Sequence, residues 1–197
     1  MQTIAITGRP RQETGKKATK MDRKSGGLPC VIYGAGEPVH FTTSASAVRH
    51  LVFTPDVKLA NIEIGGKTIS CILKDIQFHP VDERIMHIDF MELGKGRKIK
   101  LTVPVRFVGA SPGVKAGGKL IQRMRKVTIK TTPEAIIDEV SLDISSMELG
   151  SSLRVRDVKV SKDVEIMNNP SIPLASIEIP RALKSAATAE TKAAGKK

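Results

Sequence analysis

Residues 57–78 read VKLANIEIGGKTISCILKDIQF, and this stretch decides the fold class. Apolar and polar side chains alternate through residues 57–64 and again through residues 67–78. A period of two is typical of half-buried β-strands. Gly65 and Gly66 separate the two runs, and paired glycines suit a two-residue hairpin turn because its positions need positive φ. The stretch therefore predicts an antiparallel β-hairpin.

The same period recurs along the chain. Residues 3–7 and 85–90 continue it in the first half, and residues 99–107 alternate in the second. Pro104 interrupts this last run, which indicates an edge strand or a bulge, because proline cannot donate to a ladder. Shorter strands are predicted at residues 120–130, 139–144, 153–156, 164–167 and 174–179.

Helical signals are few. Ser44 is a candidate cap for a short helix through Leu51, and residues 14–24 suit one or two basic helical turns.

The polar segment 94–98, Gly-Lys-Gly-Arg-Lys, breaks the strand pattern and indicates a domain boundary. We predict a mainly β fold with a few short helices in two domains, residues 1–93 and 94–181. The Ala- and Lys-rich tail at 182–197 is expected to be disordered.

Composition excludes several classes of protein. The 197 residues include 32 basic and 20 acidic side chains, for a net charge of +12. No apolar run approaches the roughly 20 residues that span a bilayer, and the N-terminus lacks a basic region followed by an apolar one. We therefore expect no membrane association and a cytoplasmic location. Two cysteines, Cys30 and Cys71, are too few for a disulfide scaffold or a four-cysteine zinc site.

The positive charge is concentrated in two segments. Residues 9–24 carry seven basic side chains against Glu13 and Asp22, and residues 93–130 carry 11 basic side chains and no acidic one. Such a basic arm suits RNA phosphates, although most charge runs are simply solvated loops. The second segment is followed at 131–180 by 9 acidic and 4 basic residues. Its cations therefore have two candidate partners, nucleic acid and this acidic block.

Catalysis is not indicated. The four histidines and two cysteines fit no hydrolase, metalloprotease or nucleotide-binding motif. His79 and His87 are eight residues apart with Pro80 between them, so they are not the i,i+4 pair of a helical metal site. The glycine-rich loop at 109–118 lacks the following helix of a phosphate-binding loop. We expect no enzyme activity, no metal site, no cofactor and no small-molecule substrate.

Residues 85–90 form the most informative strand. Alternation places Met86, Ile88 and Phe90 on an apolar inner face, and His87 and Asp89 side by side on the outer face. These two side chains can donate to and accept from base edges, whereas an ordinary polar surface strand is the alternative. Tyr33 follows an apolar run and can stack on a base or close a barrel end. With aromatics at 3%, any bound RNA should be a structured duplex or an internal loop.

Several segments, in this order, resemble one family. They are RQETGKKATK at 11–20, LPCVIYG at 28–34, DIQFHP at 75–80, MHIDF at 86–90, SPGVKAGG at 111–118 and MELGSSLRV at 147–155. The sequence is similar to the long form of the bacterial large-subunit ribosomal protein twenty-five family, the Ctc or general stress protein type. The resemblance extends over residues 1–180, nearly the whole chain outside the tail.

The resemblance implies an N-terminal β-barrel that binds 5S ribosomal RNA at an internal loop and a second, mainly β domain. The RNA-binding residues it implies are Arg9, Lys16, Thr19, Lys20, Arg23, Tyr33, Lys74, His87 and Asp89. Lysines and arginines would neutralise phosphates, while the strand residues and the tyrosine would select the RNA. The second domain could contact neighbouring ribosomal RNA or protein.

Two competing functions remain at this point. One is a stress-related module that binds other RNA or protein off the ribosome. The other is a hydrolytic or tRNA-modifying enzyme built on a barrel, for which His79, His87 and Cys71 are the available side chains. The interpretation we favour is a structural constituent of the large ribosomal subunit.

Overall fold

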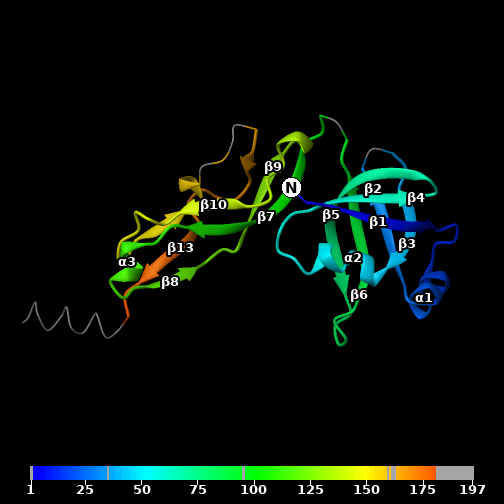
Figure 1. Cartoon of the computed structure of the whole chain (residues 1–197), viewed down its shortest axis with the longest axis horizontal. Coiled ribbons are helices and arrows are strands. Elements are labelled where there is room, and N and C mark those ends of the chain that lie inside the picture. Colours follow the sequence, from blue (N-terminus) through cyan, green and yellow to red (C-terminus); the bar gives the residue numbers. More distant parts are fainter. Residues whose placement is uncertain (1, 35, 95, 159, 161–162, 181–197) are drawn as a thin grey trace, which may run out of the picture. The chain divides into compact units, whose positions relative to one another are not determined.

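The computed structural model describes residues 2–34, 36–94, 96–158, 160 and 163–180. The described residues form two compact units, one of those up to Leu101 with Thr131–Asp138 and the other of Thr102–Lys130 with those from Glu139 onward. Both consist mainly of strands (Figure 1), so the predicted fold class is confirmed. The tail predicted at 182–197 lies outside the described residues.

The first unit is a closed barrel with the strand order β1-β3-β2-β6-β5-β4 (Figure 1). Its strands are β1 (Thr3–Pro10), β2 (Gly27–Tyr33), β3 (Val39–Ser44), β4 (Leu59–Ile64), β5 (Lys67–Phe78) and β6 (Ile85–Glu92). Helix α1 (Lys16–Lys24) connects β1 to β2, and α2 (Ala45–Val52) connects β3 to β4. Closure of the barrel pairs both sides of every strand at least in part, which limits edge-to-edge association.

Local chemistry explains where these elements begin and turn. The predicted hairpin is β4 and β5, and Gly65 and Gly66 turn it with φ of 58° and 82°. Ser44 is the N-cap of α2, where its hydroxyl accepts a hydrogen bond from the Ala47 amide at 3.3 Å. Helix α1 has no side-chain cap, but Arg23 and Lys24 in its last turn complement the negative end of the helix dipole.

The core of the barrel is aliphatic with one aromatic pair. Phe41 of β3 and Phe90 of β6 are fully buried, and their ring centroids are 5.9 Å apart. Around them pack the inward residues of every strand, including Ile6, Cys30, Ile32, Ile62, Cys71 and Ile88. Because inward and outward residues alternate on β6, burial of Ile88 and Phe90 directs His87 and Asp89 outward.

The second half of the chain forms two sheets, ordered β10-β7-β9-β12 and β11-β13-β8. The strands are β7 (Ile99–Val108), β8 (Lys119–Gln122), β9 (Lys126–Thr131), β10 (Val140–Asp143), β11 (Ser152–Arg154), β12 (Glu165–Ile166) and β13 (Pro173–Glu178). A single-turn helix, α3 (Pro112–Lys115), lies inside the glycine-rich loop. Of the two alternatives predicted from Pro104, an edge strand or a bulge, the edge strand is wrong, because β7 lies between β10 and β9. The ladder with β10 begins at Val105, directly after the proline.

Candidate nucleic-acid interface

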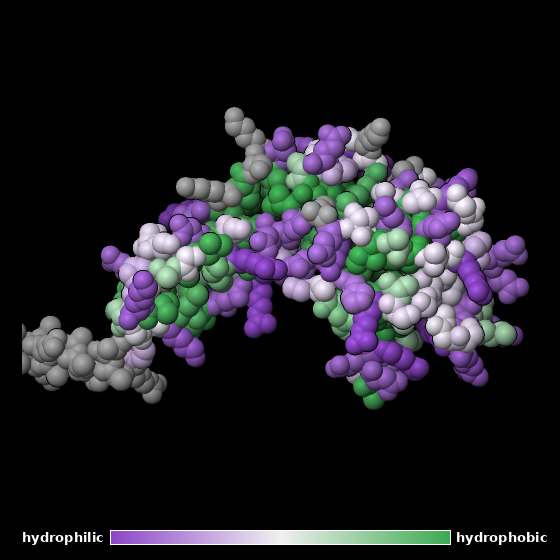
Figure 2. Space-filling view, viewed as in Figure 1, coloured by the Kyte–Doolittle hydropathy of each residue, from purple (hydrophilic) through white to green (hydrophobic). Residues whose placement is uncertain are grey.

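Helix α1 has two faces of different chemistry. Residues three and four apart share a face of a helix, which separates two groups on α1. One face carries the basic residues of the predicted site: Lys16, Lys20 and Arg23. The opposite face carries small, apolar and acidic side chains: Ala18, Met21 and Asp22. Lys16 and Lys20 are exposed, and hydrophilic side chains gather along the right edge of the barrel unit (Figure 2), where Figure 1 places α1.

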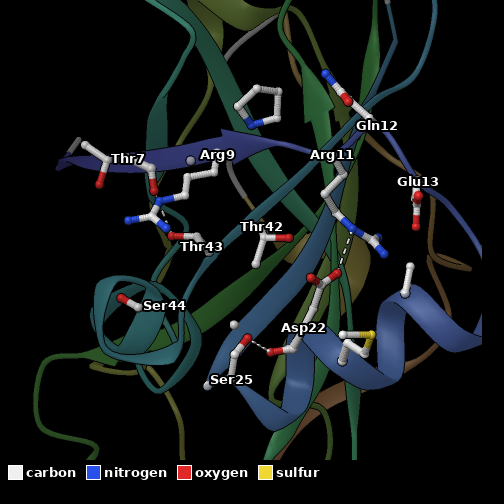
Figure 3. Close-up of a pocket in the computed structure, with 16 residues that line it drawn as sticks. Thr7, Arg9, Arg11, Gln12, Glu13, Asp22, Ser25, Thr42, Thr43 and Ser44 are labelled. Carbon is white, nitrogen blue, oxygen red and sulfur yellow. Dashed lines mark hydrogen bonds and ion pairs between the residues drawn. The ribbon is translucent and has the colours of Figure 1, made fainter.

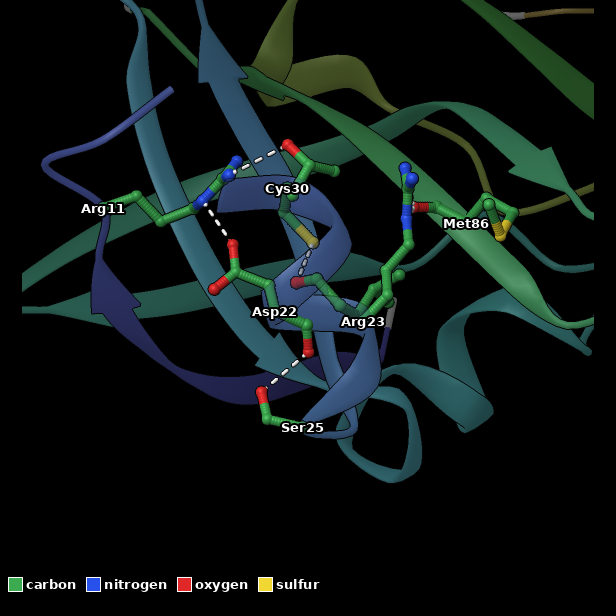
Figure 4. Close-up of polar contacts among 8 residues, drawn as sticks. Arg11, Asp22, Arg23, Ser25, Cys30 and Met86 are labelled. Atoms are coloured by element: carbon green, nitrogen blue, oxygen red, sulfur yellow. Dashed lines mark hydrogen bonds and ion pairs between the residues drawn. The ribbon is translucent and has the colours of Figure 1, made fainter. Parts of the chain in front are cut away.

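Arg23 joins this basic face to strand β6. Its Nε and Nη2 atoms donate hydrogen bonds of 3.2 Å and 3.1 Å to the Met86 carbonyl oxygen (Figure 4). Met86 directly precedes His87, so the bonds hold the end of α1 beside the strand with the predicted base-reading residues. Residues 63 positions apart are thereby brought into one surface. Part of the hydrogen-bonding capacity of Arg23 is structural, because this carbonyl takes two of its donors.

His87 and Asp89 form a close polar pair on the outer face of β6. The Nδ1 atom of His87 lies 2.6 Å from Oδ1 of Asp89, and the side chains are 25% and 29% exposed. In the antiparallel ladder with β5, Asp75 is opposite Asp89, and Gln77 is opposite His87. The polar face therefore extends across two strands. Its outward groups are accessible enough to meet a ligand and buried enough to be held in place.

A bulge in β5 creates part of this face. The register with β6 shifts between Leu73 and Asp75, which leaves Lys74 as the additional residue. Lys74 and Asp75 are consequently both exposed, although consecutive strand residues normally face opposite sides. The Lys74 ammonium donates a 3.1 Å hydrogen bond to the Lys100 carbonyl oxygen. Lys74 thus has a partner within the first unit, whereas Asp75 joins the polar face.

Tyr33 closes the outer face at the end of β2. Strand β2 runs parallel to β6, with Val31 opposite Asp89 and Tyr33 opposite Met91. Burial raises the pKa of the Tyr33 phenol, and the negative charges of Asp89 and Asp75 act in the same direction. The phenol therefore keeps its proton at neutral pH and can donate a hydrogen bond.

Arg11 and Thr19 of the basic arm are joined by a hydrogen bond. The Arg11 side chain is only 10% exposed; its Nε lies 2.9 Å from Oδ2 of Asp22, and its Nη2 donates to the Thr19 hydroxyl at 3.1 Å (Figure 4). These contacts fasten the end of β1 to α1. Thr19, predicted to contact RNA, therefore has a structural partner. Arg9, two residues before Arg11, is exposed and lies opposite Thr42 in the ladder with β3.

Cations of the second unit are partly paired with its acidic residues. Arg106 Nε lies 2.6 Å from Glu139 Oε2, and Arg123 Nη2 lies 2.6 Å from Glu178 Oε1. Each of these four side chains is at least 38% exposed, so the pairs stabilise the fold only weakly. They do reduce the positive charge available to an external ligand.

Both cysteines lie in the barrel core, where burial keeps their thiols unreactive. Cys30 and Cys71 are fully buried, and the Cys30 thiol donates to the Leu28 carbonyl oxygen at 3.6 Å. Burial raises the pKa of each thiol to about 12. The thiolate is the nucleophile, so neither cysteine is reactive in the folded barrel.

This burial predicts a loss of stability in alkali. An unfolded cysteine ionises near pH 9, while the folded thiol stays protonated to about pH 12. The unfolded state then binds fewer protons, so the free energy of unfolding falls as pH rises through this window, by up to about 1.4 kcal/mol per pH unit per thiol. Urea unfolding at pH 8 and pH 10.5 measures the loss. The Cys30→Ala, Cys71→Ala double variant is the control, and an equal alkaline loss in it would contradict the assignment.

The molecule described so far is a mainly β protein with a barrel, a strongly basic helix and a polar strand face beside it. Residues 6–90 match the model of the ribosomal L25p family, and residues 98–181 match the C-terminal domain of ribosomal protein TL5. The chain belongs to the ribosomal L25p family, as the sequence resemblance indicated.

Relatives named large ribosomal subunit protein bL25 match nearly the full chain. The protein of Bacteroides thetaiotaomicron is 39% identical over 176 residues, or 89% of each chain. That of Amoebophilus asiaticus is 38% identical over the full length of both chains, and that of Porphyromonas gingivalis ATCC 33277 is 39% identical over 95% of this chain and 98% of its own. Among the described residues, no helix is long and apolar enough to cross a membrane, and no three acidic, His or Cys side chains form a metal site.

Proposed function

We propose that this chain is a structural constituent of the large ribosomal subunit and binds 5S ribosomal RNA through the barrel. The observation that carries the proposal is the bonding of Arg23 to the Met86 carbonyl, which joins the basic face of α1 to the polar face of β6. Membership of the L25p family supports the ribosomal setting. The second unit is proposed to contact neighbouring ribosomal RNA or protein.

The two faces would divide the work of binding. Lys16 and Lys20 are exposed cations, so they would neutralise phosphates and release condensed counterions. His87 and Asp89 would meet base edges, because a carboxylate is repelled by phosphate but accepts hydrogen bonds from amino groups of bases. Side chains cannot read the narrow major groove of regular A-form RNA, so an internal loop that widens this groove suits the protruding strand face.

The proposal is tested by RNA selectivity. Full-length protein should prefer a 5S ribosomal RNA transcript to an unrelated hairpin of similar length at physiological salt, measured by filter binding. It should also sediment with the large subunit in a sucrose gradient of cell extract. Equal affinity for both RNAs, or recovery only in the free fraction, would contradict the proposal.

Two substitutions separate the roles of the faces. Lys20→Ala should weaken binding to all RNAs and reduce the slope of log K against log salt by roughly one counterion at most. Asp89→Ala should leave that slope nearly unchanged and reduce discrimination against altered loop bases, by about 1–3 kcal/mol per lost contact. Filter binding over a salt series with wild-type and loop-substituted 5S transcripts measures both. If Asp89→Ala weakened binding to every transcript equally, its assignment to base reading would be wrong.

A further inference from the structure

The other face of α1 borders a groove that is not lined by Lys16, Lys20, His87 or Asp89, the residues to which RNA contacts are assigned above. The groove has a volume of about 780 Å³ and lies between the end of β1 with the arm after it, helix α1 and the end of β3 (Figure 3). This volume is in the range of pockets that hold small organic ligands. Met21 and Asp22 line it from α1, on the side of the helix opposite Lys16 and Lys20.

One wall of the groove supplies positive charge. Arg9 is exposed on β1, and among the described residues its guanidinium has no ion pair or hydrogen bond. Figure 3 shows Arg9 on the β1 side of the groove and Asp22 on the α1 side. An unpaired guanidinium at the edge of a groove suits a phosphate, which it can bind with two parallel hydrogen bonds.

The opposite wall is acidic and apolar. Arg11 forms an ion pair with Oδ2 of Asp22, which leaves Oδ1 as an acceptor, and Glu13 adds a second carboxylate. Met21 is 72% exposed, an unusual position for an apolar side chain on a helix rich in lysine and arginine. It lines the groove from α1, and Pro10 lines it from the end of β1, so the groove offers a flexible thioether and a proline ring to a flat ligand.

Together these groups define one class of ligand. A bare phosphate or a phosphate-only backbone contact would be repelled by the two carboxylates, and a purely apolar ligand would leave Arg9 unused. A nucleotide matches the guanidinium, the apolar side chain and the carboxylates of the groove. Its phosphate pairs with Arg9, its base packs against Met21, and an exocyclic amino group donates to the carboxylates. We propose that the groove binds an unpaired nucleotide of the bound RNA whose base carries an exocyclic amino group. This rests on the proposed RNA-binding function.

The groove is tested first without RNA. Guanosine 5′-monophosphate, titrated into ¹⁵N-labelled full-length protein, should shift the amide signals of Gly26 and Gly27, which line the groove. Uridine 5′-monophosphate has no exocyclic amino group and should bind at least fivefold more weakly. Arg9→Ala and Met21→Ala should each weaken the guanosine nucleotide about tenfold. Arg49→Ala removes an exposed arginine of α2 that lines neither surface and should change nothing. Absence of shifts, or equal binding of the two nucleotides, overturns the proposal.

A second arm identifies the source of the nucleotide. Nuclease footprinting of the 5S transcript with Met21→Ala should lose protection at an unpaired nucleotide while the remaining footprint persists. If Met21→Ala weakened the mononucleotide but left the footprint intact, the assignment to bound RNA would be overturned. The mononucleotide titration does not depend on the transcript, so failure of the proposed function and failure of the groove are distinguishable.

Discussion

Replacement of Asp22 by alanine is expected to destabilise the barrel unit and to weaken RNA binding, although it removes a negative charge from a protein that binds a polyanion. The reason is Arg11, which is 10% exposed and has the Asp22 carboxylate at 2.9 Å. Among the described residues, loss of the carboxylate leaves a nearly buried guanidinium with the Thr19 hydroxyl as its remaining side-chain partner. Orphaning one member of such a pair costs about 3–5 kcal/mol when both are buried, and about 2 kcal/mol is expected because Asp22 is 30% exposed.

The weaker binding follows from the position of α1. Arg11 and Asp22 fasten the helix to the end of β1, so their separation loosens the element that presents Lys16 and Lys20. Urea unfolding and filter binding over a salt series measure both effects. The slope against salt should stay near that of the wild type, because no phosphate ligand is removed. If Asp22→Ala bound RNA more tightly at unchanged stability, the net charge of α1, and not its attachment to β1, would determine the affinity for RNA.

Two further variants isolate the pair. Glu63→Ala removes one exposed carboxylate from β4 and should leave stability nearly unchanged and binding slightly stronger. The double variant Arg11→Met, Asp22→Leu replaces both partners by apolar side chains of similar length. Since neither charge is then left unpaired, it should recover most of the stability lost in Asp22→Ala.

Much of the barrel could be predicted because burial on one face leaves a readable pattern. The hairpin at 57–78 and the strand at 85–90 alternate, and a glycine pair marks the turn between β4 and β5. The alternation does not reveal strands β2 and β3. In β2, Leu28, Pro29 and Cys30 are all buried, so the apolar run has no alternation to reveal it.

In the candidate site, too, the features that follow from local periodicity could be predicted and those that depend on tertiary contacts could not. Placement of His87 and Asp89 on one face follows from a local period of two, and the helical spacing of Lys16, Lys20 and Arg23 is equally local. The bonds of Arg23 to the Met86 carbonyl join residues 63 apart, and no local pattern encodes such a contact.

Two more features depend on tertiary structure. Asp75 was missed because the bulge at Lys74 changes the alternation of β5, and a bulge leaves no periodic signal. Arg11 is one of the seven basic side chains of the arm, and nothing local distinguishes it from the others, because its burial against α1 exists only in the folded barrel. The sequence therefore identifies the charged residues more reliably than it distinguishes those that contact RNA from those that stabilise the fold.

Phe90→Ala is expected to have the largest effect on stability, lowering the free energy of unfolding of the barrel unit by about 3–5 kcal/mol. The ring is fully buried and packs against Phe41 at 5.9 Å, so truncation removes core contacts and leaves a cavity inside a closed barrel. Phe53→Ala is the matched control, since Phe53 is 64% exposed and its partner Phe78 is 47% exposed. Its cost should stay below about 1.5 kcal/mol.

The Phe90 substitution also connects the core to the interface. Phe90 points inward directly after Asp89 points outward, so the packing of the ring fixes the strand that carries the polar face. If Phe90→Ala is too unstable to measure, Phe90→Leu keeps most of the volume and should lose only about 1–2 kcal/mol. At temperatures where Phe90→Leu is folded, its selectivity for the 5S transcript should fall more than that of Phe53→Ala. Equal stability and equal RNA selectivity in the Phe53 and Phe90 variants would contradict this prediction. The polar face would then not depend on the packing of the core beneath it.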